Sequence, residues 1–114
     1  DSPKVSIDKL TLPKHVAIGD ALDIAFSVTA QADAQRFVLD YAIHFVKANG
    51  KTAPKVFKIK NCDLNKDKGL EISKSHSLKL ITTRKYYPGE HFLAIHINGE
   101  EVARKAFNVK PLKK

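Results

Sequence analysis

Apolar residues recur at every second position along most of this 114-residue chain, and that spacing restricts the possible fold more than any other feature. The clearest run is at residues 22–29, where Leu22, Ile24, Phe26 and Val28 alternate with small or polar side chains. A period of two places successive side chains on opposite faces of an extended strand, so that one face can be buried. The same pattern predicts strands at residues 5–12, 39–46, 57–60, 78–80 (after apolar residues 70 and 72), 92–97 and 107–109.

Turn signals separate these runs at regular intervals. Asn98-Gly99 and Asn49-Gly50 are pairs that can adopt the positive φ angles of tight hairpin turns. Residues 61–69 form a polar connection without apolar periodicity. Short strands and regular turns together predict an all-β fold, an immunoglobulin-like β-sandwich of about seven antiparallel strands. The length fits a single domain that covers residues 1–114.

Residues 32–48 allow two interpretations. They contain no Gly or Pro, and their apolar content fits a helix as well as a strand. Aromatic and β-branched residues, among them Phe37, Val38 and Ile43, favour the strand.

The positive charge of the chain is concentrated in one third of its length. Residues 47–85 contain eleven Lys and Arg against three Asp and Glu, an excess of eight that equals the net charge of the whole chain. Such segregation makes one surface attract polyanions. No apolar run approaches the length of a membrane helix, so we expect no membrane partner. Cys62 is the single cysteine, which favours a reducing, cytoplasmic location because small secreted domains usually carry several disulfides.

Patterns for catalysis or metal binding are weak. His91 and His96 are five residues apart on one predicted strand and therefore point to opposite faces. His76 and His91 could meet, but no cysteine or carboxylate completes a site, and hydrogen-bonded histidines at the end of the sandwich are the simpler interpretation. The serines around His76 lack the glycines and the acidic partner of a nucleophile motif. We expect no cofactor, no metal and no catalysis by this chain alone.

Residues 73–91 carry the strongest binding signal, because hydroxyl, cationic and aromatic side chains are interleaved there. Hydroxyls and amides can donate hydrogen bonds to phosphate oxygens, and cations add long-range attraction. Tyr86 or Tyr87 could stack on a base or a sugar. Immunoglobulin-like folds often use one tyrosine near the penultimate strand for packing, and we assign that role to Tyr87.

The predicted strand around Phe57 carries a second group of cations. Lys58 and Lys60 should both point outward if Phe57 and Ile59 point inward. Phosphate binding and protection of an edge strand against aggregation explain these lysines equally well.

Several segments then show a resemblance to a known module: Leu39-Asp40-Tyr41, Pro54-Lys55-Val56-Phe57-Lys58, Ser75-His76-Ser77, residues 82–91 and Ile97-Asn98-Gly99. They resemble the C-terminal immunoglobulin-like domain of bacterial DNA alkylation repair proteins built from HEAT-like helical repeats, the AlkC-like alkylpurine DNA glycosylases. The resemblance covers nearly the whole chain and is densest at residues 75–99. It implies a parent protein that excises alkylated purines without extruding the damaged base. Catalysis would then reside in helical repeats outside this chain, while this domain grips the duplex.

The predicted function is therefore a non-catalytic DNA-binding accessory domain, excised from the C-terminus of a DNA alkylation repair protein. Its predicted partners are double-stranded DNA and the helical-repeat domain of the same parent chain. Part of the contact set follows from the resemblance and part from the basic residues: Lys58, Lys60, Lys74, Ser75, His76, Lys79, Thr83, Arg84, Lys85 and Tyr86. One alternative is a protein- or glycan-binding adhesion module of a secreted bacterial protein, which salt-insensitive binding would indicate. A small hydrolase that uses His76 or His91 is the other.

Overall fold

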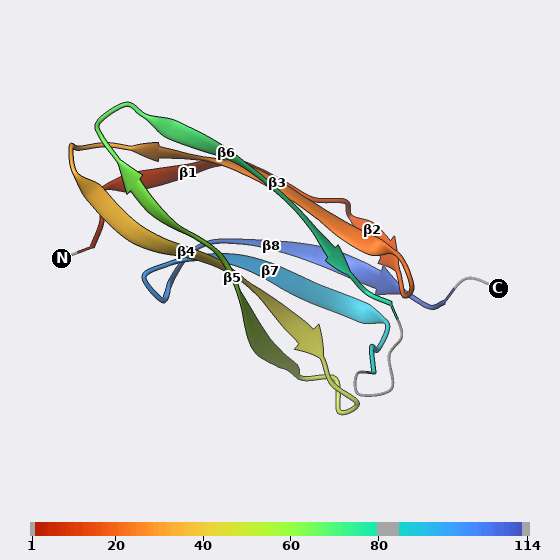
Figure 1. Ribbon diagram of the computed structural model, residues 1–114. Coiled ribbons are helices and arrows are strands. Elements are labelled where there is room, and N and C mark those ends of the chain that lie inside the picture. Colours follow the sequence, from red (N-terminus) through yellow and green to blue (C-terminus); the bar gives the residue numbers. More distant parts are fainter. Residues whose placement is uncertain (1, 80–84, 113–114) are drawn as a thin grey trace.

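A computed structural model describes residues 2–79 and 85–112 as two packed β-sheets (Figure 1). The strands are β1 (Val5–Thr11), β2 (His15–Ala17), β3 (Ala21–Ala30), β4 (Gln35–Val46), β5 (Thr52–Leu64), β6 (Gly69–Ser77), β7 (Gly89–Ile97) and β8 (Glu100–Lys110). One sheet has the order β1-β3-β6 and the other β2-β8-β7-β4-β5. Neighbouring strands are antiparallel except β2 and β8, which are parallel. The predicted all-β, immunoglobulin-like sandwich is confirmed, and the short β2 brings the strands of the described ranges to eight.

The ambiguous segment at residues 32–48 is a strand. β4 pairs with β5 on one side and with β7 on the other, and Leu39, Tyr41 and Ile43 point into the core. A helix cannot satisfy both ladders, because its backbone groups bond within the helix itself.

Two predicted boundaries are wrong. Residues 61–64 belong to β5 and not to the polar connection, because Cys62 pairs with Phe37 and both side chains are buried. The strand expected at residues 78–80 lies instead at residues 69–77, where β6 pairs with the full length of β3. Leu78 follows the strand and is buried, its amide bonded to the carbonyl of Asp20, and residue 80 lies outside the described ranges.

The core fills the space between the two sheets of an elongated molecule, 50 × 23 × 22 Å. The alternating apolar residues of β3 face those of β4, β7 and β8, and Leu22, Val28, Leu39 and Ile95 are completely inaccessible to solvent. Each such side chain stabilises the fold by about 1.5–3 kcal/mol relative to its exposed state.

The two Asn-Gly pairs both make hairpin turns, with different geometry. At the β7–β8 turn both residues have positive φ, 51° for Asn98 and 84° for Gly99. Asn98 also fastens this turn to β4: its side-chain oxygen accepts a hydrogen bond from the amide of Val38, and its own amide donates to the Val38 carbonyl. At the β4–β5 turn the positive φ is confined to Gly50, at 81°.

Candidate nucleic-acid interface on the edge strands

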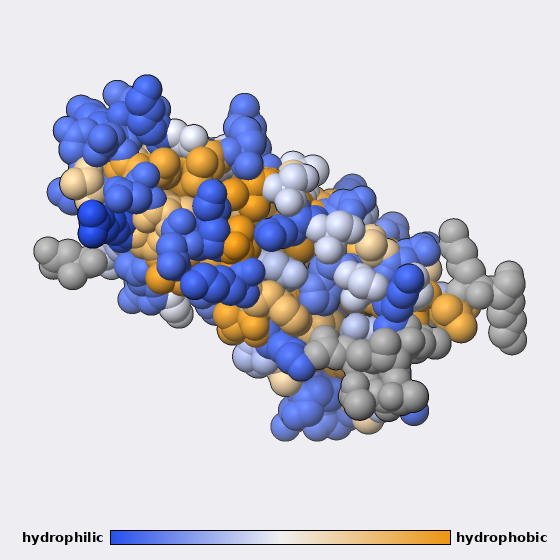
Figure 2. Space-filling model, viewed as in Figure 1, coloured by the Kyte–Doolittle hydropathy of each residue, from blue (hydrophilic) through white to orange (hydrophobic). Residues whose placement is uncertain are grey.

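The basic stretch includes two edge strands that flank the same side of the sandwich, and four of its eleven basic residues lie on them: Lys55, Lys58, Lys60 and Lys74. β5 is the edge of the five-stranded sheet and β6 is the edge of the three-stranded sheet. In Figure 1, β5 crosses in front of β4 and β6 in front of β3, and the turn between them passes from one sheet to the other. Figure 2 shows apolar residues lying between hydrophilic ones in this view. The prediction that the strand around Phe57 is an edge is confirmed.

The two lysines of β5 do not share a face. Lys58 pairs with Asp40, which points away from the core, while Lys60 pairs with the buried Leu39. A bulge between these two pairs inserts Ile59 and reverses the alternation. Phe57 and Ile59 pack against the core and both lysines are exposed, as expected, but the register after the bulge sets Lys60 opposite Leu39. The Lys60 side chain points to the interior side of the sheet and is still exposed, because β5 has no neighbour beyond it.

The candidate residues of β6 alternate in the same way. Lys74 and His76 pair with buried residues of β3 and share its interior side, whereas Ser75 pairs with Asp23 on the outer face. Lys74 is exposed because β6 is an edge strand. Lys60 and Lys74 thus lie on the facing sides of the two edge strands.

His76 closes the gap between the sheets beside these lysines. Its Nδ1 atom is 2.8 Å from the hydroxyl oxygen of Tyr41, and its ring packs edge-on against Phe57 at 4.6 Å between centroids. The Tyr41 ring stacks on Phe57 at 5.2 Å. Burial raises the pKa of the Tyr41 hydroxyl, which keeps it protonated. His76 therefore connects β6 to β4 and β5, in agreement with the interpretation of His76 as a hydrogen-bonded structural histidine.

Tyr86 is the buried residue of the tyrosine pair, and not Tyr87. Tyr86 is 8% exposed and packs against Phe45 at 5.8 Å between ring centroids, so its ring is not available for stacking on a base. Tyr87 is half-buried, and the Lys85 ammonium lies 5.6 Å from its ring centroid. The assignment of the packing role to Tyr87 is therefore wrong, because it is Tyr86 that Phe45 covers.

His91 is a neutral core residue. It is 1% exposed, its Nδ1 donates to the carbonyl of Gly89 at 3.1 Å, and its Nε2 accepts from the amide of Val46 at 3.4 Å. Burial lowers its pKa, and the bond to Gly89 opposes this in part. His96, five residues later, lies on the other face of β7, opposite Asp40. The predicted separation of these two histidines is confirmed.

The remaining predicted contacts lie where β6 ends and β7 begins. Lys79 is exposed just after β6, and its amide donates to the Ser77 hydroxyl. Lys85 precedes Tyr86, and the ring of Tyr86 packs against Phe45, which lies next to the β4–β5 hairpin. Lys47 and Lys51 of that hairpin therefore lie at the same end of the sandwich as Lys85. The Asn49-Gly50 turn signal could have placed those two lysines there from sequence. Thr83 and Arg84 lie outside the described residues.

Other chemistry finds little support. In residues 2–79 and 85–112, no three His, Cys, Asp or Glu side chains are grouped to hold a metal ion. Burial raises the pKa of the Cys62 thiol, which opposes the formation of a reactive thiolate. Over the same ranges no helix is long and apolar enough to cross a membrane.

These features define an immunoglobulin-like β-sandwich module with cationic edge strands. Residues 6–111 match the family described as the C-terminal Ig-like domain of the uncharacterised protein YhaZ, and the chain belongs to that family. The chain is 41% identical over 88 residues to uncharacterized protein YhaZ of Bacillus subtilis (strain 168). This alignment covers 77% of this chain and 24% of the relative.

Solved structures give the same picture. The alkylpurine DNA glycosylase AlkC of Pseudomonas fluorescens, bound to DNA containing an abasic site analog, superposes with a TM-score of 0.92 at 33% identity over 96% of this chain and 31% of that one. The resemblance found in the sequence is thereby confirmed. A β-glucosidase from Listeria innocua matches 96% of this chain and 16% of its own with a TM-score of 0.78 at 14% identity, which reflects the fold alone. The chain spans about a quarter to a third of the length of the first two relatives.

Proposed function

We propose that this chain is the non-catalytic C-terminal domain of a cytoplasmic DNA alkylation repair protein, and that it binds the phosphate backbone of double-stranded DNA. Residues 1–114 would form one domain of a longer chain whose helical repeats carry the catalytic residues. The observation that supports this most is the similarity to a DNA-bound alkylpurine DNA glycosylase, with a TM-score of 0.92 at 33% identity.

The proposed contact surface is the side formed by β5 and β6, together with the end that holds Lys79 and Lys85. Lys60 and Lys74 lie on the facing sides of their edge strands, Lys58 adds a cation on β5 at the margin of the outer face, and Ser75 offers a hydroxyl donor. Binding would release counterions from the duplex and show little sequence preference. Thr83 and Arg84 join this set from the sequence alone, and the hairpin lysines Lys47 and Lys51 would add to it. His76 and Tyr86 would support the surface through packing.

The test is a salt titration of binding to a 20-base-pair duplex by the 114-residue chain. If about four phosphates are neutralised, log Kd should rise with log salt at a slope near 3.6, from a Kd of about 10⁻⁶ to 10⁻⁴ M. The double variant Lys60→Gln, Lys74→Gln should lower that slope by about 1.8.

Lys14→Gln is the matched control, because Lys14 is exposed beside β2 and β8, at the opposite edge of the five-stranded sheet. An unchanged slope in the double variant would remove β5 and β6 from the interface. Salt-insensitive binding to protein or glycan would favour the adhesion module instead.

A further inference from the structure

The outer face of the five-stranded sheet is closed at its centre by its own side chains, while apolar side chains stay exposed around that centre. Paired residues of β5, β4, β7 and β8 form a row across this face: Val56, Ala42, Ala94 and Arg104. Ala42 and Ala94 are completely inaccessible to solvent. The side chains around these alanines therefore already cover the centre of the face, and the accessible apolar surface lies beside it.

Exposed apolar side chains gather on the same sheet. In the described ranges four large hydrophobic residues are more than a third exposed, and three of them belong to this sheet: Val38 at 38%, Val56 at 54% and Val102 at 48%. Val38 and Val56 lie on the outer face, and Val102 lies between Glu101 and Arg104 at a bulge in the β7–β8 ladder. These valines lie on β4, β5 and β8, and each presents apolar surface that a docked polypeptide could cover.

The polar groups of this face are held in fixed positions. Arg104 forms two hydrogen bonds to the Glu101 carboxylate, at 2.9 and 3.1 Å, and lies over the Phe92 ring at 5.1 Å. The Arg104 Nη2 atom is also 3.2 Å from Nε2 of His44. His96 Nε2 is buried and has no hydrogen-bond partner within the described part of the chain. This nitrogen is inaccessible to solvent, so it belongs to the packed layer of the sheet and offers no contact to an outside group.

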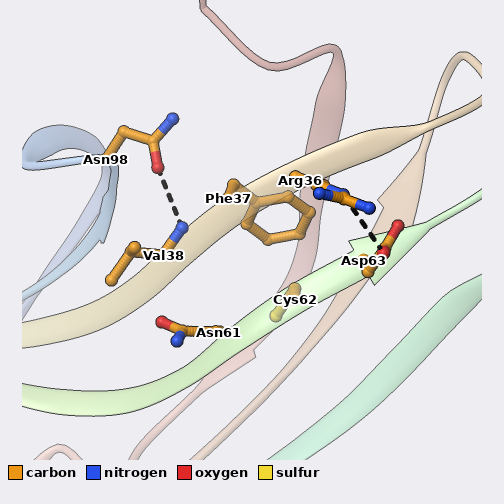
Figure 3. Close-up of a pocket in the computed structure, with 7 residues that line it drawn as sticks. All are labelled: Arg36, Phe37, Val38, Asn61, Cys62, Asp63 and Asn98. Carbon is orange, nitrogen blue, oxygen red and sulfur yellow. Dashed lines mark hydrogen bonds and ion pairs between the residues drawn. The ribbon is translucent and has the colours of Figure 1, made fainter.

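The position of the first described residues indicates which polypeptide could lie on the outer face. Ser2 and Pro3 line a hollow with Asn98 and Glu100 at the β7–β8 turn. Asn98 also lines a shallow hollow of about 470 Å³ with Val38 and Asn61, and Figure 3 shows Val38 and Asn61 on adjacent strands, with Asn98 bonded to Val38 from the turn. A polypeptide that precedes residue 2 would therefore reach the domain at the margin of the outer face.

We propose that this outer face is the surface on which the domain docks against the polypeptide that precedes it in the full-length protein. The proposal rests on the proposed function for the existence of that polypeptide, since the family is described as a C-terminal domain and the relatives are about three times as long as this chain. The docked segment would cover the exposed side chains of Val56 and Val102. Duplex DNA fits this face poorly, because Asp40 and Glu101 flank His96 in the register.

The test uses the full-length protein with a photoreactive benzoylphenylalanine at position 56. The matched control carries the same group at position 73, an exposed serine on the outer face of the three-stranded sheet. Irradiation should cross-link position 56 to residues N-terminal to the domain in the same molecule, at a yield roughly tenfold above that of position 73. Cross-links to a second copy or to DNA, or equal yields at both positions, would overturn the proposal.

A second variant separates this proposal from DNA binding. Val102→Glu should reduce the cross-link from position 56 roughly tenfold and leave the salt dependence of duplex binding unchanged. Lys60→Gln with Lys74→Gln should do the reverse. If Val102→Glu leaves the cross-link intact, the docking proposal fails while the proposed function stands. If only the lysine variants have no effect, the DNA-binding proposal fails while the docking surface stands.

Discussion

The hydrogen bond between Tyr41 and His76 joins the two sheets on the side of their edge strands β5 and β6, and its removal should lower the stability of the domain. Tyr41→Phe removes a single hydroxyl, 2.8 Å from Nδ1 of His76, and leaves the ring that stacks on Phe57. A neutral hydrogen bond contributes about 0.5–1.5 kcal/mol, and a partner left unsatisfied in a partly buried site adds to the loss. We therefore expect the free energy of unfolding to fall by about 1–2 kcal/mol.

The double-mutant cycle isolates the contact. His76→Phe keeps an aromatic ring near Phe57 and removes both ring nitrogens. If the bond is responsible for the loss, the combination with Tyr41→Phe should cost less than the sum of the two single changes, with a coupling energy of about 1 kcal/mol. Lys74→Gln, two residues away on the same exposed side of β6, is the control and should change stability by less than about 0.5 kcal/mol.

Urea unfolding followed by far-ultraviolet circular dichroism is the suitable assay, because the chain contains no tryptophan. The expected loss for Tyr41→Phe should appear as a lower urea midpoint at constant m-value. A coupling energy near zero would show that His76 does not join the sheets through Tyr41, and would return His76 to the group of candidate DNA contacts.

Three further predictions follow from buried or crowded residues. Burial lowers the pKa of His91 below its ordinary 6.5, so the unfolded chain holds the proton more tightly. The contribution of neutral His91 to the free energy of unfolding should be fully present above pH 6.5 and should fall at lower pH by at most about 1.4 kcal/mol per pH unit. His91→Phe should make the free energy of unfolding less dependent on pH in this range. An equally steep dependence in the variant would argue against a neutral His91. Gly69→Ala would place a Cβ atom 2.7 Å from the Val28 carbonyl oxygen and should cost about 1–3 kcal/mol in urea unfolding, against almost nothing for Ser73→Ala. Alkylation of Cys62 at pH 8 should be slow in the folded chain and rapid in urea, because burial raises its thiol pKa; equal rates would mean that the thiol is accessible.

The alternation of residues 22–29 was enough to predict β3, because side chains in a strand point to opposite faces with a fixed period of two. β5 and β6 were harder to recognise. Lys60, Lys74 and His76 occupy interior-side positions of edge strands, where a polar side chain still reaches solvent, so the apolar alternation is broken there. The same effect explains why β5 was predicted too short.

The tyrosines show where local sequence ceases to decide. Tyr86 and Tyr87 are adjacent and chemically identical, and Tyr86 is buried because Phe45, distant in the chain, lies over its ring. The outer face of the five-stranded sheet is a similar case. Val38, Val56 and Val102 come from three strands and meet on one sheet through strand order, which no local pattern specifies.

The sequence by itself determined the strand content, the hairpin turns, the excess of positive charge and the family, because each depends on neighbouring residues or on direct comparison of residues. Only the tertiary structure decided which lysines lie on the facing sides of the two edge strands, that His76 bonds to Tyr41, and which side chains lie on the outer face of the five-stranded sheet. Those relations depend on strand order, register and one bulge, which arise from contacts between residues far apart in the chain.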